Sequence, residues 1–279
     1  MLGICSLFIP ASSPRMINAS FSVEADSLIF DLEDAVHISE KDSARILLRN
    51  ALPLFNGRNI AIRINANDDY WMEDLELFRL GIAHNVVVPK ARAEQIKQIS
   101  ALLDDMNADV DIEALIESAD SLEELSEICR ASKRVRGLLM GGEDYSLDLG
   151  VERTRKGDEI LFARTKIANV ARAYDLESLD TPFSDVQDED GLMQDAKFAK
   201  GIGYTGKLSI NPLQVKGIQK VFRPEDKEIK WAQKILDAAG MPENVGLGAF
   251  SLDGKMIDLP VIKRAEKTIQ RAGIERNVL

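Results

Sequence analysis

The chain has 279 residues, of which 46 are acidic and 35 are basic, so its net charge is -11 at pH 7. This length suits one α/β barrel of about 250 residues with a short extension better than two full domains. The acidic balance disfavours a nucleic-acid partner, because phosphate binding depends on clustered Lys and Arg.

The two cysteines and the amino-terminal segment provide information on the cellular compartment of the protein. Cys5 and Cys129 lie in apolar segments without CxxC spacing, so we expect two buried thiols in a reducing cytoplasm, not a redox or zinc site. The opening MLGICSLFIPASSPR has no basic region before its apolar run, and no segment approaches the ~18 apolar residues of a membrane span. We therefore expect a cytoplasmic protein with no membrane partner.

Eight short apolar segments recur along the chain and are predicted as strands. Each is too short for a helix and is bounded by polar or turn residues. They are CSLFIP (5–10), SLIFDL (27–32), NIAIRI (59–64), NVVVPK (85–90), DIEALIE (111–117), VRGLLMGG (135–142), LESLDTP (176–182) and GKLSINP (206–212). Helix starts are predicted between them by capping residues, namely Ser13 before Pro14, Ser39 with Asp42, and Ser121 with Glu124.

Alternating apolar strands and helices indicate a parallel sheet covered by helices. Eight such units favour closure into a (β/α)8 TIM barrel, with an open doubly wound sheet as the alternative. Polar residues also collect where the strands end, and in a barrel these ends meet on one face. They are Asp31, Glu33, Arg63, Asn65, Lys90, Glu117, Glu143, Asp144, Asp180 and Asn211.

The pattern changes near residue 221. We predict a barrel over residues 1–220 and a C-terminal extension over 221–279, with helices in EDKEIKWAQKILDAAG and LPVIKRAEKTIQRAG and a glycine-containing loop between them. The extension is expected to act as a lid on a barrel mouth or to reach a neighbouring subunit.

Glu117 and Asp144 follow consecutive predicted strands, so both carboxylates are expected to reach one point on the barrel axis. Mg²⁺ prefers one or two carboxylates plus water and substrate oxygens, and a chain with only two histidines cannot build a His-rich zinc centre. The alternative is that each acid only caps a helix. Because Arg63 ends a strand nearby, we interpret the three residues as one site.

Arg63 lies in an otherwise apolar strand, where an unpaired guanidinium would be costly. Its partner is either a strand-end acid, Asp31 or Glu33, or a substrate carboxylate or oxyanion formed in the reaction. The glycines of GGED and GIGYTGK match neither GxGxxG nor a Walker A loop, and the serines near the amino terminus lack a histidine partner. The sequence therefore contains no signal for dinucleotide binding or a P-loop, and serine hydrolysis is excluded.

Several segments resemble one family. In chain order they are FIPASSPRM, FDLEDAVHISEKDSAR, VVVPK, ALIES, GGEDYSLDLG, ILFAR, GKLSINPLQV and GKMIDLPVIKRA. Together they resemble the HpcH/HpaI-type aldolases and citramalyl- or malyl-thioester lyases, a family that includes citrate lyase β subunits, to which SINP and ILFAR are more similar. The resemblance implies a TIM barrel with a C-terminal extension, Mg²⁺ bound by Glu117 and Asp144, and substrate contact by Arg63.

The resemblance also implies roles for three further acids. Asp258 would be a catalytic acid or base, often in a neighbouring subunit's site in relatives; the alternative is an N-cap for the helix near Pro260. Asp31 and Glu33 would hold metal-bound waters or orient Arg63. Asp34 is assigned to the following turn.

Two departures from the family pattern concern the thioester carrier. Ile4 and Ala11 stand where many relatives have an arginine and a glycine, which argues against tight coenzyme A binding. Arg15, Lys41 and Arg45 are candidates for the phosphate of a carrier-protein phosphopantetheine arm, the alternative being a solvated basic helix face.

The expected reaction is retro-Claisen cleavage of a citryl thioester of an acyl-carrier protein to oxaloacetate and an acetyl thioester. A homo-oligomer is expected, with other citrate lyase subunits as candidate partners. The alternatives are a stand-alone lyase for citramalyl- or malyl-coenzyme A, and a scaffold subunit without turnover.

Overall fold

The computed structural model describes residues 2–66, 68–241 and 244–272. The chain divides into two compact units, one ending at Phe222 and one beginning at Arg223. None of the helices in these ranges combines the length and the apolar character needed to cross a membrane. Cys5 and Cys129 are buried thiols, as predicted.

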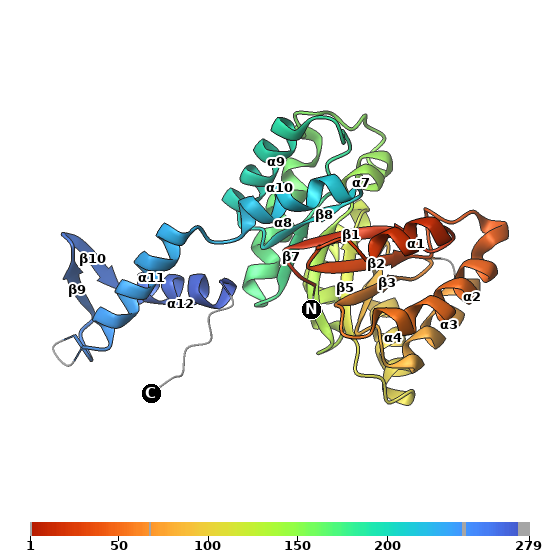
Figure 1. The fold of residues 1–279 in the computed structure, drawn as a ribbon, viewed down its shortest axis with the longest axis horizontal. Coiled ribbons are helices and arrows are strands. Elements are labelled where there is room, and N and C mark those ends of the chain that lie inside the picture. Colours follow the sequence, from red (N-terminus) through yellow and green to blue (C-terminus); the bar gives the residue numbers. More distant parts are fainter. Residues whose placement is uncertain (1, 67, 242–243, 273–279) are drawn as a thin grey trace. The chain divides into compact units, whose positions relative to one another are not determined.

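The first unit is a closed barrel of parallel strands in chain order (Figure 1). Pairing of β8 with β1 closes it, which confirms the barrel over the open sheet. Each predicted strand segment contains one observed strand. The strands are β1 (Cys5–Pro10), β2 (Ser27–Asp31), β3 (Ile60–Arg63), β4 (Asn85–Val88), β5 (Asp111–Ile116), β6 (Val135–Met140), β7 (Glu177–Asp180) and β8 (Gly206–Ser209).

Helices surround these strands, with α1 to α4 on one side of the barrel in Figure 1 and α8 to α10 on the other. They are α1 (Pro14–Ser20), α2 (Lys41–Ala51), α3 (Asp68–Leu75), α4 (Ala93–Asp105), α5 (Ala119–Glu123), α6 (Leu125–Ala131), α7 (Gly142–Asp148), α8 (Asp158–Ala173), α9 (Glu189–Ile202) and α10 (Pro212–Phe222). Three 3-10 turns add to them, η1 (Ile38–Glu40), η2 (Leu52–Phe55) and η3 (Glu76–Leu80).

One of the three predicted helix starts is confirmed. Ser13 caps α1, its hydroxyl accepting the N–H of Met16 at 3.3 Å. The prediction for Ser39 is wrong, because this residue lies within η1 and α2 begins afterwards. The prediction for Ser121 is also wrong. The chain turns into α5 directly after β5, so Ser118 is the cap and accepts the N–H of Ser121 at 3.1 Å.

Side chains alternate between the barrel interior and the helix layer along each strand. One interior layer consists of Ile29, Ala61, Val87, Leu115, Leu139, Leu179 and Leu208, while flanking residues such as Leu28 and Phe30 pack against the helices. A residue two positions after an interior one faces inward again. The chain therefore directs Asp31, Arg63, Glu117 and Gly141 to the carboxyl-end mouth of the barrel.

The second unit contains α11 (Asp226–Ala239), β9 (Ala249–Leu252), β10 (Lys255–Asp258) and α12 (Leu259–Arg271). Both predicted helices are present and share a small core with Ile257. The segment predicted as a loop instead forms an antiparallel hairpin. Its turn residues, Asp253 and Gly254, have φ values of 51° and 74°, as a two-residue type I′ turn requires.

Candidate active site

The carboxyl ends of the strands enclose a cavity of about 440 Å³. One part of its wall is apolar, with Phe8, Leu115 and Leu208, and the rest is strongly polar. The polar side includes Asp31, Asp34, Arg63, Glu117, Glu143, Asp144 and Thr181. Side chains predicted at the ends of four different strands are thus brought together here.

Arg63 is fixed by the neighbouring strand. Asp31 is its register partner, and the two side chains form a two-point ion pair, Nε–Oδ1 and Nη2–Oδ2, with both distances 2.7 Å. The guanidinium also lies 4.9 Å from the ring centroid of Phe8. Burial acts to lower the pKa of Arg63, but the hydrogen bonds and charge of Asp31 outweigh it and raise that pKa. Arg63 is therefore a permanent, oriented cation on the cavity wall.

Asp31 also organises the loop after β2. Its carboxylate accepts the N–H groups of Glu33 at 2.9 Å and Ala35 at 3.0 Å. This loop returns two further acids to Arg63, whose Nη1 lies 3.3 Å from Glu33 Oε2 and 3.5 Å from Asp34 Oδ2. The acids that end β2 are thus neighbours of one cation. Asp34 lies in the turn after β2, as expected from the sequence, and also lines the cavity.

Glu117 projects from the end of β5 and is 3% exposed. Its Oε1 accepts the N–H of Lys90 at 2.8 Å, and Lys90 has a left-handed backbone with φ 46°. Gly141 makes room beside it, because a Cβ there would lie 2.6 Å from both Cβ and Oε2 of Glu117. Burial, followed by the charge of Glu33, raises the pKa of the Glu117 carboxyl to about 8.

Asp144 lies in the first turn of α7 and is partly buried. Burial, followed by the charge of Asp34, raises its pKa. The ammonium of Lys90 lies 3.9 Å from Asp144 Oδ2 and 3.6 Å from Glu33 Oε1. Burial is also the largest cause of the raised pKa of Glu33, about 7. Five carboxylates therefore share two cations, Arg63 and Lys90, and the site has an excess of negative charge.

This excess fits a divalent cation at Glu117 and Asp144. Mg²⁺ is commonly held by one or two carboxylates, with water and substrate oxygens completing its shell, and the cavity leaves space for both. In the part of the chain that is described, the buried Glu33 Oε2 accepts no hydrogen bond, although Arg63 Nη1 lies 3.3 Å away, so it could accept from a metal-bound water. The same residues contain no cluster of three or more His, Cys, Asp or Glu able to hold a metal.

The basic residues predicted for a phosphate lie in different environments. The alternative of a solvated basic helix face is wrong for Lys41, because this residue is buried and its ammonium donates to the carbonyls of Leu32 at 2.8 Å and Glu33 at 2.7 Å. Arg45 is paired with three carboxylates from α2 and α3. Arg15 is exposed at the start of α1.

Asp180 does not join the ring of polar strand ends, so that prediction is wrong. The preceding residue, Leu179, faces the barrel interior, and Asp180 therefore points toward the helix layer. There its carboxylate pairs with Arg164 and Lys207, all three side chains being buried. The role of Asp180 is structural.

Asp258 lies in the second unit, at the end of β10. Its Oδ1 accepts the N–H of Val261 at 3.2 Å, so it is the N-cap of α12. The capping role considered from the sequence is confirmed, while the catalytic role stays a prediction.

Some site residues were not given a role from the sequence. Lys90 was recognised only as a strand-end residue, and Gly141 only as part of GGED. The role of Lys90 depends on its backbone N–H, and the role of Gly141 depends on the space that it leaves for Glu117. Neither feature can be recognised from a single sequence. Glu113, buried inside the barrel with its Oε1 3.3 Å from the N–H of Leu2, was also missed.

Comparison with known proteins agrees with this geometry. The family model described as HpcH/HpaI aldolase/citrate lyase matches residues 5–212, which include every strand of the barrel. The chain belongs to this family. Among HpcH/HpaI proteins, citrate lyase subunit beta of Haemophilus influenzae is 37% identical over 95% of both chains. The resemblance found in the sequence is thereby confirmed.

Solved structures of the same family are similar as well. CitE of Mycobacterium tuberculosis in complex with magnesium, acetoacetate and coenzyme A is 32% identical, with a TM-score of 0.78 over 98% of both chains. The citrate lyase beta subunit of M. tuberculosis complexed with oxaloacetate and magnesium is 31% identical, with a TM-score of 0.70 over 80% of this chain and 98% of that one.

Proposed function

We propose that the protein is a Mg²⁺-dependent carbon–carbon lyase that cleaves a citryl thioester of an acyl-carrier protein into oxaloacetate and an acetyl thioester. The observation that carries this proposal is the cavity in which Glu117 and Asp144, with excess negative charge, face the oriented guanidinium of Arg63. The H. influenzae relative is a citrate lyase subunit, and the M. tuberculosis proteins bind magnesium with keto acids. These findings support the same chemistry.

The reaction breaks the bond between the carbinol carbon and the thioester's α-carbon. The hydroxyl loses its proton, the electron pair of the broken bond moves into a thioester enolate, and the enolate carbon is finally protonated. Mg²⁺ held by Glu117 and Asp144 would supply Lewis acidity toward the hydroxyl and its neighbouring carboxylate. Arg63 is already oriented by Asp31, so it can stabilise charge developing on the enolate oxygen without rearrangement. The apolar wall around Phe8 excludes water from the enolate.

Metal binding gives the direct test. In calorimetric titrations with Mg²⁺ and oxaloacetate, we expect Glu117→Ala and Asp144→Ala each to abolish measurable binding. Asp120→Ala is the matched control, because this acid follows the same strand but is exposed and paired with Arg92 outside the cavity. Wild-type affinity in either site variant would refute the metal assignment.

A second candidate is a stand-alone lyase for citramalyl- or malyl-coenzyme A. The coenzyme A bound to M. tuberculosis CitE favours it. Assays with carrier-protein and coenzyme A thioesters separate the two: the proposed function requires a higher kcat/KM for the citryl carrier protein. A scaffold subunit would turn over neither.

We also propose that Asp258 protonates the enolate carbon at the mouth of a neighbouring subunit in a homo-oligomer. Its cap geometry leaves Oδ2 without a bond among the described residues, although Oδ1 is used. Mixing inactive Asp258→Ala with inactive Glu117→Ala under subunit exchange should restore activity, because some interfaces then contain both residues. No recovery despite proven exchange would contradict action across subunits.

A further inference from the structure

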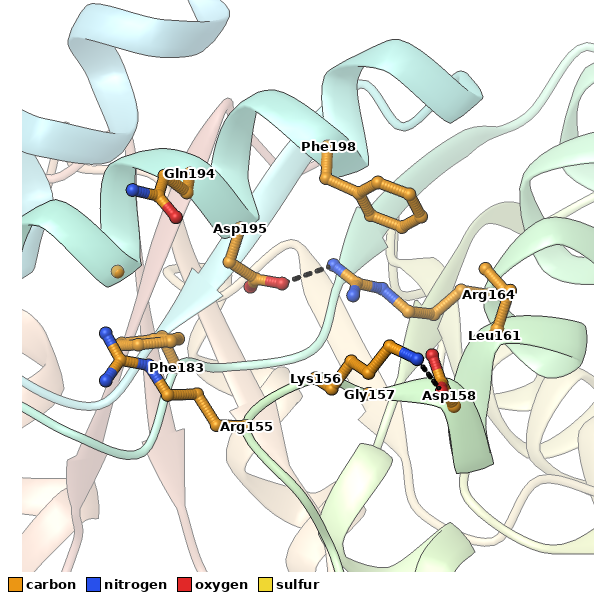
Figure 2. A pocket seen from close by; sticks show the side chains of 11 residues that line it. Arg155, Lys156, Gly157, Asp158, Leu161, Arg164, Phe183, Gln194, Asp195 and Phe198 are labelled. Atoms are coloured by element: carbon orange, nitrogen blue, oxygen red, sulfur yellow. Dashed lines mark hydrogen bonds and ion pairs between the residues drawn. The ribbon is translucent and has the colours of Figure 1, made fainter.

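A second cavity, of about 380 Å³, lies outside the barrel between α8 and α9. Figure 2 shows the side chains that line it, with Phe198 and Arg164 on one side and Arg155 beside Phe183 on the other. All of them belong to the first unit. Neither the family resemblance nor the strand-end pattern assigns them a role.

The floor of this cavity is a buried ion-pair network that leaves one donor group unused. Arg164, which is 3% exposed, donates from Nε and Nη2 to Asp180 and from Nη2 to Asp195. Lys207 completes the network by pairing with both acids, so the four charges cancel. Over the described ranges Nη1 of Arg164 has no acceptor, and it lies 3.8 Å from the place of a Cβ on Gly157. In the described residues Nη1 is not among the buried side-chain atoms that lack a partner, so solvent or a ligand in the cavity can reach it.

Aromatic side chains form the walls beside this donor. The ring of Phe198 lies 5.0 Å from the Arg164 guanidinium and is 43% exposed, so part of its apolar face is open to a ligand. Phe183 lies opposite, and its carbonyl accepts a hydrogen bond of 2.7 Å from Gln214. A cavity with apolar walls and a guanidinium edge fits a ligand that has an anionic group attached to an apolar body.

The rim of the cavity adds two cationic side chains, and each can leave its present carboxylate partner with little loss of stability. The side chains of Arg155 and Lys156 are 74% and 80% exposed and pair with Asp188 and Asp158. Exposed pairs of this kind contribute little to stability, so both cations can exchange a carboxylate for a phosphate. Helix α8 also begins here, after Gly157 in the left-handed region and without a side-chain cap, which places its positive dipole end at the cavity.

The cavity lies next to the barrel mouth. Thr181 and Pro182 line the mouth cavity, and the next residue, Phe183, lines the second one. Ser184 then donates a hydrogen bond of 2.6 Å to Glu143, which also lines the mouth. An extended ligand that leaves the mouth over the β7–α9 loop would therefore reach Arg155, Lys156 and Arg164.

We propose that the cavity between α8 and α9 binds the phosphate of the phosphopantetheine arm that carries the thioester. This inference rests on the proposed function, which requires such an arm. It replaces Lys41, whose buried ammonium donates to two carbonyls, and Arg45, which is paired with three carboxylates. The cations of the new site suit the phosphate, and its apolar walls suit the dimethyl group next to that phosphate.

Calorimetry with phosphopantetheine and with pantetheine, which lacks the phosphate, tests this directly at low ionic strength. Wild-type protein should bind phosphopantetheine at least about tenfold more tightly, equivalent to about 1.4 kcal/mol. The double variant Arg155→Ala/Lys156→Ala should lose this preference, whereas Phe198→Ala should weaken both ligands. Arg79→Ala/Lys97→Ala is the matched control, because these side chains are 54% and 58% exposed and also paired with acids, but lie on η3 and α4. Arg164 is left intact because the buried network supports folding.

The outcomes separate this inference from the proposed function. Equal affinity for the two ligands, no binding of either at millimolar concentration, or a preference that survives in the double variant would each overturn the phosphate site. Mg²⁺-dependent binding of oxaloacetate, measured in parallel, should be unchanged in the double variant and reports on the mouth alone. Coenzyme A and a phosphopantetheinylated carrier protein share the arm, and the double substitution should weaken whichever of them the protein uses.

Discussion

Gly141→Ala is the sharpest test of how the metal site is built. The backbone at Gly141, with φ -98° and ψ 85°, is not in the left-handed region, so any effect of alanine comes from its methyl group. That carbon would lie 2.6 Å from Glu117 Cβ and Oε2, whereas ordinary contacts begin near 3.4 Å. The Cβ of Glu117 is held by β5 and cannot rotate away. A shift of about 0.8 Å is therefore needed, at an overpacking cost of about 1–3 kcal/mol.

The same shift moves a metal-binding carboxylate. We expect affinity for Mg²⁺ in the presence of oxaloacetate to fall at least about tenfold by calorimetry. Thermal unfolding should show a modest loss of stability with a cooperative transition. Gly201→Ala is the control, because this glycine lies inside α9 with nothing within 4 Å of an added Cβ. It should be neutral or stabilising by about 0.5–1 kcal/mol. Wild-type metal affinity in Gly141→Ala would refute the argument that this glycine makes room for Glu117.

Three other substitutions test separate contacts. Arg63→Lys should lower kcat/KM at least about 100-fold with Mg²⁺ binding retained, since lysine cannot reproduce the planar two-point pair with Asp31; near-normal turnover would give Arg63 a purely structural role. Lys41→Met should reduce the free energy of unfolding by about 1–3 kcal/mol for each carbonyl it leaves without a donor, measured by urea denaturation against the exposed Arg49→Met; equal stability of the two variants would contradict this. Burial raises the pKa of Glu113 from 4.5 to about 8, so the native state holds this proton more tightly than the unfolded chain. Its contribution to stability is complete below pH 4.5 and is lost as pH rises toward 8, by at most about 1.4 kcal/mol per unit. Glu113→Gln should flatten this decline, and parallel stability curves for both proteins would disprove it.

The barrel and most of the residues at its mouth could be predicted from local sequence patterns. Short apolar segments and amphipathic helices are local patterns with different periods, so each element could be read from its own residues. The identity of the polar residues at the strand ends then indicated Arg63, Glu117 and Asp144 as one site, because parallel strands of a closed barrel finish on the same face. Alternation places Arg63 and Glu117 two positions after Ala61 and Leu115 of the interior layer.

Which of these polar groups line the cavity and which stabilise the fold depends on contacts between distant segments and could not be predicted from local patterns. Leu179 faces the barrel axis, so the next residue in the strand, Asp180, faces the helix layer and pairs with Arg164. A lysine in the first turn of a helix is normally exposed, but the ammonium of Lys41 donates hydrogen bonds to two carbonyls of the preceding loop. The hydrogen-bond and ion-pair partners of these residues lie in other segments of the chain, whose positions depend on packing. A local sequence pattern therefore cannot predict them. The sequence therefore determined which chemical groups are available, and the packing of distant segments determined which groups they meet.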